Sequence, residues 1–526
     1  MHAGDLLSKR AELTPKREAL LELATGIHYT YAELNQRANR LANVLRGQFG
    51  IVKGDRVSVL AHNSVAYLDL LYGVAKIGAI LAPLNWRLVS RELAYILGDC
   101  QPKVVIVGLE FAEVALELRR EVAVPHWVSL EGTELEGAVP YERMLAKASD
   151  TEPTRPRLDA EDPYCILYTS GTTGPPKGAV IPHRQVLWNC INTVASWGLS
   201  ERDVSPVFTP LFHAGGLFAF LTPLFYLGGR LVLARSFDAE GSLRAIEQER
   251  CTVILGVPTL FQMWLNTKVF PKADFRHVRW FISGGAPCPG TLMQTWRDAK
   301  HIVFRQGYGL TEVGPNCFSM SDEDSVPKSG SVGKPIFHSA MQILDTEGGQ
   351  VPTGAVGELA IKGPHVCSGY WQNPQASAQA LRDGWFHTGD IVRADEDGFF
   401  YIVGRYKDMI ISGGENIYAA EVEAVFLEHP TVAEAALISE PHDKFGEVGV
   451  MVIVPRSGPS PTQAELLEFC QRRLARYKVP KRIVVTDALP YSPYGKVQKS
   501  VLQERFVSKR AGEQGLRADA IEPVDK

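Results

Sequence analysis

YCILYTSGTTGPPKG, at residues 164–178, is the stretch from which the fold and the chemistry of this chain can first be read. An apolar run, YCILYT, predicts a buried strand that ends in a turn rich in glycine, serine and threonine, closed by Lys177. This composition suits a bound phosphate, because glycines let backbone N–H groups converge, hydroxyls donate hydrogen bonds and lysine adds charge. The phosphate loop of kinases is a weak match, since Pro176 and Gly178 replace its second glycine and its magnesium-binding hydroxyl. From composition alone, an ordinary surface loop is the alternative.

Short apolar runs recur on both sides of this stretch, and each is followed by a glycine, a turn or a helical pattern. They are VSVLA from Val57, VVIV from Val104, RLVLA from Arg230, TVILGV from Thr252, VRWFIS from Val278 and HIVFRQ from His301. A first amphipathic helix is expected near Tyr31, because Thr30 and Glu33 form a capping-box pattern. Alternating strands and helices predict an α/β domain with mainly parallel sheets, in which loops at the carboxyl ends of strands collect ligand groups.

The pattern changes from about Gln342, where shorter runs such as GELAIKG (357–363) and GFFYIVG (398–404) lie between glycine turns. These runs predict antiparallel sheet or a small barrel. A second break falls at GRYKDMIISGGENIY, residues 404–418, and beyond it a compact α+β unit is expected. Its helix begins at Thr462 and carries Leu466, Cys470 and Leu474 on one face. The polar segment 509–526 is expected to be a mobile tail.

Length and composition indicate a globular protein of two or more domains, with 526 residues, of which 45% are hydrophobic. A formal net charge of -4 argues against nucleic-acid binding and favours a small-molecule substrate. Eight cysteines without a CxxC pair, and no recognisable signal peptide, predict a cytoplasmic protein without disulfides or a zinc site. The apolar stretch Leu211–Gly229 is interpreted as a buried segment beside a site rather than a membrane span, because glycines, a proline and His213 interrupt it.

Three polar clusters follow strand-like runs: SGGAP (283–287), YGLTE (308–312) and WFHTGD (385–390). The first allows close backbone approach to a flat base, and the second offers an aromatic face with a threonine and a carboxylate for phosphate and Mg²⁺. The third offers a carboxylate that could take two ribose hydroxyls. Each cluster alone is more often a turn or a capped strand end, so it is the occurrence of all three in this order that indicates a nucleotide site.

The motifs together resemble the adenylate-forming superfamily, which contains acyl- and aryl-CoA synthetases, beetle luciferases and peptide-synthetase adenylation domains. In order they are YTSGTTGPPKG, PLFHAGG, SGGAP, YGLTE, GELAIKG, GWFHTGD, GRYKDMIISGGENIY and PYSPYGK. The resemblance is closest to a stand-alone bacterial acyl- or aryl-CoA synthetase. It implies a large domain over residues 1–406, with mainly parallel sheets, flanking helices and a small distorted β-barrel, and a smaller α+β lid domain over residues 407–526.

The same resemblance implies an ATP site. The β- and γ-phosphates would lie along Thr169, Ser170, Gly171, Thr172, Thr173, Gly174 and Lys177. Adenine would lie among Gly284, Gly285, Ala286, Pro287 and Tyr308. Thr311 would contact the α-phosphate, Glu312 would bind Mg²⁺, and Asp390 with Arg405 would hold the ribose. Lys496 would reach the substrate carboxylate and the α-phosphate, and it would supply the positive charge that the attack of one anion on another requires.

An acyl pocket and a CoA path are implied as well. His213 would line the pocket near the thiol entrance, although a histidine in an apolar run is more often a core residue. The small residues after it either leave space for an aromatic ring or a longer chain, or allow close packing. The other expected pocket residues are Ala214, Gly215, Gly216, Trp188, Asn192, Phe212, Phe218, Gly309 and Val313. Lys407 matches a hinge position, where domain rotation would bring Gly413, Gly414 and Glu415 toward the site.

The implied activity is that of an ATP-dependent carboxylic acid:CoA ligase using Mg²⁺. It would form an acyl-adenylate and pyrophosphate, and then acyl-CoA and AMP, from a medium-chain, long-chain or aromatic acid. One alternative is an acyl-AMP ligase that passes its product to a carrier protein or another acceptor, and a second is a catalytically silent nucleotide-binding protein. No nucleic-acid partner and no integral membrane association are expected, and a homodimer is the default oligomeric state.

Overall fold

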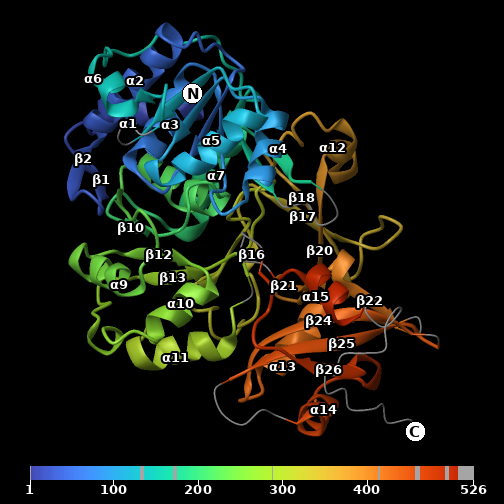
Figure 1. The fold of residues 1–526 in the computed structure, drawn as a ribbon. Coiled ribbons are helices and arrows are strands. Elements are labelled where there is room, and N and C mark those ends of the chain that lie inside the picture. The colour runs from blue at the N-terminus through green and yellow to red at the C-terminus, as the bar shows by residue number, and fades with distance from the viewer. Residues whose placement is uncertain are drawn as a thin grey trace. The chain divides into compact units, whose positions relative to one another are not determined.

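A computed structural model describes residues 2–130, 135–169, 175–286, 288–412, 415–442, 444–456, 462–491 and 497–507 of the chain (Figure 1). The chain divides into two compact units. The first contains the residues up to 341 together with 360–387, and the second contains 342–359 and the residues from 388 onward. The predicted domain boundary near Lys407 stays a prediction.

The largest sheet of the first unit has seven strands in the order β7-β6-β5-β3-β4-β8-β9. These are β3 (Arg56–Leu60), β4 (Ile80–Pro83), β5 (Val104–Val107), β6 (His126–Ser129), β7 (Val139–Pro140), β8 (Pro163–Thr169) and β9 (Lys177–Pro182). All neighbours are parallel except β8 and β9, which form an antiparallel pair with Thr169 opposite Lys177. The central runs are apolar on both faces, as expected for parallel strands covered on both sides. The predicted strand YCILYT is confirmed.

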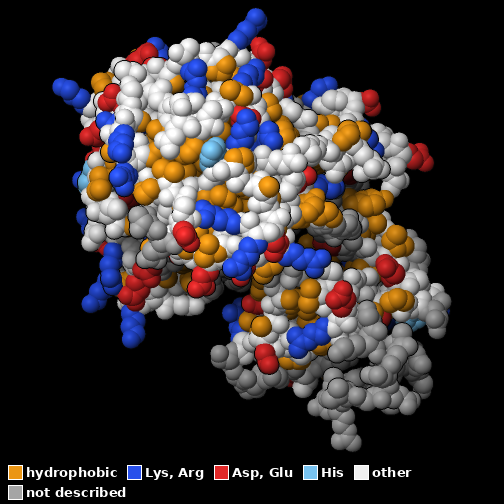
Figure 2. Space-filling view, turned by 45° about the horizontal axis from the view of Figure 1, so that its top comes forward, with side chains coloured by type: hydrophobic (Ala, Val, Ile, Leu, Met, Phe, Trp, Pro, Cys, Tyr) orange, Lys and Arg blue, Asp and Glu red, His pale blue; other side chains and the backbone are white. Residues whose placement is uncertain are grey.

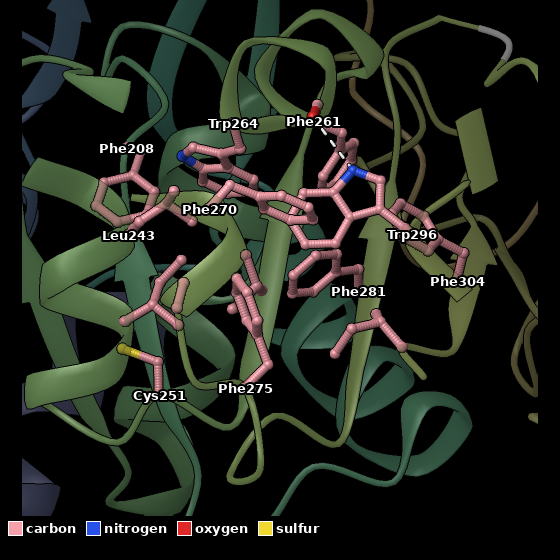
Figure 3. Close-up of a cluster of buried hydrophobic side chains, with 14 of the residues drawn as sticks. Phe208, Leu243, Cys251, Phe261, Trp264, Phe270, Phe275, Phe281, Trp296 and Phe304 are labelled. Carbon is pink, nitrogen blue, oxygen red and sulfur yellow. Dashed lines mark hydrogen bonds between the residues drawn. The ribbon is translucent and has the colours of Figure 1, made fainter. Parts of the chain in front are cut away.

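Two further sheets complete the core of the first unit, in the orders β10-β11-β1-β2 and β12-β13-β14. Their strands are β1 (Glu18–Glu22), β2 (Ile27–Thr30), β10 (Val204–Val207), β11 (Arg230–Leu233), β12 (Val253–Gly256), β13 (Trp280–Ser283) and β14 (Phe304–Gln306). Aromatic side chains pack on the three-stranded sheet, among them Phe261, Phe281 and Trp296 (Figure 3). The indole N–H of Trp296 donates to the carbonyl of Phe261 at 3.2 Å, so this core also satisfies its polar group. A short pair, β15 (Phe318–Ser319) with β16 (Lys334–Pro335), lies in the same unit.

Helix α2 (Tyr31–Gly47) begins where its sequence predicts. The Thr30 hydroxyl accepts the N–H of Glu33, and the Glu33 carboxylate accepts the N–H of Thr30. Helix α2 packs on α3 (Val65–Lys76). The other described α-helices of the unit are α1 (Leu6–Leu13), α4 (Ser90–Cys100), α5 (Ala112–Glu121), α6 (Tyr141–Ala146), α7 (His183–Trp197), α8 (Leu221–Leu227), α9 (Ala239–Gln248), α10 (Pro258–Leu265), α11 (Gly290–Lys300) and α12 (Pro374–Ala380).

The apolar stretch Leu211–Gly229 is mostly buried, as expected, and contains a single π-helical turn (Gly215–Ala219) followed by α8. Among the residues that the structure describes, no helix is both long enough and apolar enough to cross a membrane. Basic and acidic side chains are intermixed on the face drawn in Figure 2, in agreement with the nearly balanced charge of the sequence.

The antiparallel segment predicted from Gln342 forms a five-stranded half-barrel sheet, in the order β17-β18-β20-β19 with β21 beside β20. Its strands are β17 (Ala340–Leu344), β18 (Val356–Lys362), β19 (Leu381–Arg382), β20 (Trp385–Ala394) and β21 (Phe400–Arg405). Turns with glycine at positive φ separate these strands. The glycines that predicted the change of pattern in the sequence therefore also allow the chain to reverse direction.

The remainder of the second unit is an α+β fold around the sheet β23-β22-β25-β24, with β26 beside β25. Its elements are β22 (Met409–Ser412), β23 (Glu415–Tyr418), α13 (Ala419–Leu427), β24 (Val432–His442), β25 (Gly446–Pro455), α14 (Gln463–Gln471), β26 (Arg482–Val485) and α15 (Lys499–Phe506). Alternate residues of β25 face opposite sides: Met451 packs with α13 and α14, and Val450 packs with Leu502 of α15. The predicted helix extends too far at its end, because Leu474 lies beyond the end of α14 although it joins the same core.

Candidate active site

The YGLTE motif forms a tight loop directly after β14. Gly309 permits this loop, because a Cβ atom at this position would lie 2.3 Å from the carbonyl oxygen of Gly314. A backbone bridge joins Leu310 to Gly314 and closes the turn. The loop therefore presents Thr311 and Glu312 at its tip, and Gly309 has a backbone role there whether or not it also lines an acyl pocket.

Three groups from other segments hold the backbone of this loop. The side-chain amide of Gln185, in α7, donates to the carbonyl of Thr311 at 3.1 Å. The backbone N–H of Cys367 donates to the backbone carbonyl of Glu312 at 2.7 Å. The imidazole Nδ1 of His365 donates to the carbonyl of Val313 at 2.6 Å. Burial lowers the pKa of His365, so the neutral tautomer with the proton on Nδ1 fits this contact. The loop is thus fixed before any ligand binds.

The Glu312 side chain is buried, and its Oε1 accepts a hydrogen bond from the Tyr370 hydroxyl at 3.0 Å. Burial, followed by the nearby charge of Glu312, raises the pKa of Tyr370, so this phenol remains a neutral donor. Within the described residues, no group of three or more His, Cys, Asp or Glu side chains could hold a metal ion. One carboxylate nevertheless suits Mg²⁺, which is commonly held by one or two carboxylates together with substrate phosphates and water.

Lys177 is exposed at the start of β9, and its ammonium lies 5.4 Å from the centre of the Tyr370 ring. Thr169 stands opposite it across the hairpin, and the Thr169 hydroxyl donates to the Lys177 carbonyl at 3.4 Å. The two ends of the glycine-rich turn are therefore adjacent, as an anion loop requires. The predicted phosphate ligands between them, Ser170, Gly171, Thr172, Thr173 and Gly174, lie outside the described residues.

The predicted adenine segments meet at the carboxyl ends of β13 and β14. The N–H of Gly307 donates to the carbonyl of Ser283 at 2.8 Å, which places SGGA beside YGLTE. Gly285 has a φ of +79°, a conformation that favours glycine, and a Cβ atom on Gly284 would meet nothing closer than 3.9 Å. Ala286 is exposed, and the Tyr308 ring packs edge-on against Phe318 at 5.6 Å. Pro287 lies outside the described residues.

Some of the predicted acyl-pocket residues are half-buried or next to open space, and others are packed and buried. Half-buried His213 lies against Phe212 with 4.3 Å between ring centres, and the space around Gly215 is open. Gly216 leaves no space, because a Cβ atom there would lie 2.3 Å from the carbonyl of Pro210, so close packing explains this glycine. Ala214, Phe218 and Val313 are buried.

Asn192 and Trp188 face a residue that the motifs do not reveal. The Asn192 side-chain oxygen accepts from both the backbone N–H and the Nδ1 of His338, at 3.1 and 2.8 Å. Trp188, one turn earlier in α7, packs edge-on against the same imidazole at 4.9 Å. The place of both residues in an acyl pocket stays a prediction.

In the second unit, Asp390 and Arg405 lie opposite each other in β20 and β21. Arg405 Nε is 2.9 Å from Asp390 Oδ1, and the Asp390 side chain is only 4% exposed. The resemblance pairs these residues without a distance, and the structure shows the contact. Their predicted role toward ribose stays a prediction.

The predicted hinge and lid residues are only partly described. Lys407 lies in a short 3-10 turn, Tyr406–Asp408, after β21, and its side chain is outside the described part of the chain. Glu415 is exposed and opposite Ser412 in the β22–β23 pair. Gly413, Gly414 and Lys496 lie outside the described residues.

Sequence reasoning missed four side chains that build the site of the first unit: Gln185, His338, His365 and Tyr370. They lie between or beside the motifs, and each acts on a residue far away in the chain. For Tyr370, the available signal is the Gly369-Tyr370-Trp371 sequence, an aromatic pair after a glycine that has a φ of +115°.

Comparison with known proteins identifies two family models in the chain, the AMP-binding enzyme over residues 7–371 and its C-terminal domain over residues 421–496. A feruloyl-CoA synthase of an Amycolatopsis species is 40% identical over 95% of this chain and 98% of that protein. A long-chain-fatty-acid–CoA ligase of Mycobacterium tuberculosis is 37% identical over 96% of this chain and 98% of its own length. The ATP-bound crystal structure of MatB from Rhodopseudomonas palustris matches with a TM-score of 0.87 at 33% identity, over 96% of this chain and 99% of that one.

Proposed function

The chain belongs to the AMP-binding enzyme family, and we propose that it is a carboxylic acid:CoA ligase that works in two steps. In the first step a carboxylate oxygen of the acid bonds to the α-phosphorus of ATP, and the bond to the pyrophosphate oxygen breaks. In the second step the CoA sulfur bonds to the acyl carbon, the thiol proton is lost and AMP leaves. The products are acyl-CoA, AMP and pyrophosphate.

The observation that carries this proposal is the junction of SGGA with YGLTE, with a buried carboxylate and an exposed lysine beside it. Gly307 and Ser283 join the two loops at 2.8 Å, Glu312 is fixed at the tip of its loop, and Lys177 lies over Tyr370. A flat base, a phosphate chain and a metal ion need these kinds of groups: exposed backbone, a cation and an oxygen ligand. Preorganised groups are effective because they need no rearrangement at the moment of reaction.

Glu312 is the residue proposed to hold Mg²⁺. Its carboxylate is an oxygen ligand of the kind that magnesium prefers. Among the described residues its Oε1 accepts a hydrogen bond from the neutral hydroxyl of Tyr370, which leaves the negative charge for the cation. Bound magnesium supplies a Lewis acid that draws charge from the phosphate oxygens and from the leaving pyrophosphate. Thr311 is proposed to contact the α-phosphate, and Lys177 to orient the β- and γ-phosphates.

The second unit is proposed to contribute the ribose ligands and the activating cation. Asp390 presents carboxylate oxygens that can accept both ribose hydroxyls while Arg405 compensates its charge. Lys496 is proposed to reduce the repulsion between the substrate carboxylate and the α-phosphate. Rotation about Lys407 would then exchange this lysine for the face that carries Glu415, so that the thiol can approach.

An aromatic acid is the proposed substrate, and a long-chain acid is the second candidate. No atom lies within 4 Å of a Cβ atom placed on Gly215, two residues after His213, which leaves room for a flat ring. The similarity to a feruloyl-CoA synthase at 40% identity supports the aromatic acid, and the similarity to a long-chain-fatty-acid ligase at 37% supports the alternative. Turnover with hydroxycinnamic, benzoic, medium-chain and long-chain acids tests this choice directly.

The test of the activity is AMP release measured with ATP, Mg²⁺ and each acid, with and without CoA. CoA-dependent AMP release is expected. Exchange of labelled pyrophosphate into ATP without CoA-dependent turnover would instead indicate an acyl-AMP ligase with another acceptor. The absence of both exchange and AMP release across the panel would contradict the proposed enzyme and favour a catalytically silent nucleotide-binding protein.

A further inference from the structure

Tyr370 lies in a short segment, residues 367–371, that is tied to β9 on both sides. The N–H of Val180 donates to the carbonyl of Gly369 at 2.9 Å, and the N–H of Trp371 donates to the carbonyl of Gly178 at 2.7 Å. The Ser377 hydroxyl, in α12, accepts the backbone N–H of Tyr370 at 2.8 Å. One contact of the Tyr370 backbone and one contact on each side of it therefore fix this part of the chain, and none of the three uses the phenol ring or hydroxyl.

We propose that Tyr370 is a positioning residue that orients the magnesium carboxylate Glu312 and the phosphate-binding Lys177 at the same time. Its hydroxyl lies 3.0 Å from Glu312 Oε1, and its ring centre lies 5.4 Å from Lys177 Nζ. This inference rests on the proposed function, in which Glu312 holds Mg²⁺ and Lys177 meets the β- and γ-phosphates. No other described contact joins these two groups through one side chain.

The chemistry of a phenol suits this double role. A hydroxyl can fix one carboxylate oxygen without cancelling the negative charge, whereas an arginine or a lysine in its place would compete with the metal ion. The negative face of an aromatic ring attracts an ammonium within about 6 Å of its centre, and so restricts a long flexible side chain. Tyr370 thus limits the freedom of a cation and an anion without pairing with either as a counter-ion.

Tyr370→Phe and Tyr370→Leu separate the two contacts. Tyr370→Phe removes the hydroxyl and keeps the ring, whereas Tyr370→Leu removes both. The matched control is Tyr141→Phe, because the Tyr141 hydroxyl also donates to a buried carboxylate at 3.0 Å, that of Asp69, and Tyr141 has no assigned part in the ATP site. The measurement is calorimetric binding of ATP to each protein, in excess Mg²⁺ and in EDTA, with thermal unfolding to verify the fold.

Tyr370→Phe is expected to reduce the gain in ATP affinity that Mg²⁺ provides by about tenfold or more, because a hydrogen bond to a charged group is lost, and to leave the affinity in EDTA unchanged. Tyr370→Leu is expected to weaken binding in EDTA as well, by about threefold, because Lys177 is no longer held. Tyr141→Phe is expected to change neither affinity. Ser377→Ala, which frees the backbone of Tyr370, is expected to give a weaker magnesium-specific loss and serves as the second variant if Tyr370→Phe unfolds.

The positioning role would be overturned if Tyr370→Phe lowered the ATP affinity equally with and without Mg²⁺. It would also be overturned if neither Tyr370→Phe nor Ser377→Ala lowered the ATP affinity. Other results would contradict the proposed function itself. If Mg²⁺ does not strengthen ATP binding to the wild-type protein, or if Glu312→Gln keeps the full magnesium gain, then Glu312 is not the metal ligand. The two failures are therefore distinguishable within one set of titrations.

Discussion

Each unit contributes one buried carboxylate to the candidate site, Glu312 in the first and Asp390 in the second, and the structure surrounds the two differently. Glu312 in the first unit accepts a hydrogen bond from the neutral phenol of Tyr370. Asp390 in the second unit lies 2.9 Å from the guanidinium of Arg405. A buried carboxylate with a neutral donor keeps its charge available for a cation, whereas one that is paired with a cation is compensated and can still accept neutral hydroxyls. These different partners fit the proposed roles of Glu312 as a metal ligand and of Asp390 as a ribose ligand.

The first prediction concerns Lys496. It tests whether the second unit, which holds the Asp390–Arg405 pair, also supplies the positive charge for acyl-adenylate formation. Lys496→Ala is expected to slow acyl-adenylate formation by about 10³-fold or more, since two anions then meet without a neutralising group. Thioester formation from supplied acyl-adenylate is expected to stay within about threefold of wild type. Single-turnover assays of each half-reaction measure both rates, and equal losses would refute this division of labour.

Asp390→Ala tests the sugar side of the comparison. ATP affinity is expected to fall by about 10- to 100-fold, because hydrogen bonds to a charged group are lost and Arg405 is left without this carboxylate. Calorimetry with ATP measures the loss, and Asp390→Asn, which keeps the acceptor oxygen, should recover part of it. An unchanged ATP affinity would remove Asp390 from the ribose role.

Lys177→Ala tests the other charge near the metal side. Lys177 is exposed and proposed to orient the leaving pyrophosphate, so its loss is expected to slow adenylation by about tenfold, less than the loss of Lys496. Lys177→Arg keeps the charge and is the matched control. If pyrophosphate–ATP exchange falls further in Lys177→Ala than in Lys496→Ala, the assignment of these two lysines is reversed.

The smallest effect concerns the stability of the first unit in acid. Burial lowers the pKa of His183, the first residue of α7, to about 4, and neither ring nitrogen has a hydrogen-bond partner among the described residues. The unfolded chain therefore binds the proton first, so this contribution to stability is full above about pH 6.5 and is lost as the pH falls toward 4. At about 1.4 kcal/mol per pKa unit, this contribution to the free energy of unfolding is at most about 3.5 kcal/mol.

His183→Phe removes this titration and keeps a ring against Tyr164. Its unfolding midpoint in urea should depend less on pH between 6.5 and 4 than that of wild type. Identical pH profiles for the two proteins would show that another group governs the stability of the first unit in acid.

The parts of the fold that the sequence predicts are those with local causes. Thr30 and Glu33 are three residues apart and cap α2 reciprocally, and the apolar run from Tyr164 forms β8 as its composition indicates. The order of the motifs also locates Thr311, Glu312 and the Asp390–Arg405 pair without any structure, because short polar clusters follow strands at fixed places in this family.

The remaining features have causes that are distant in the chain. The bond from Tyr370 to Glu312 spans 58 residues and that from Gln185 to Thr311 spans 126, so no local pattern encodes them. Two further features are local, yet residue type and helical period alone do not decide them. Gly216 is fixed by the nearby carbonyl of Pro210 rather than by an open pocket, and Leu474 joins its core after α14 has ended.

The segment that carries Tyr370 also changes how the largest sheet meets its surroundings. Strand β9 stands at the end of the seven-strand order, where unpaired backbone groups could join a strand of another molecule. Residues 368–371 cover this edge through an antiparallel bridge between Ala179 and Tyr370 and through bonds at 2.7 to 3.0 Å. Loosening the segment would therefore expose an aggregation-prone edge in the same event that disorders Glu312 and Lys177, so lost activity and lost solubility should appear together.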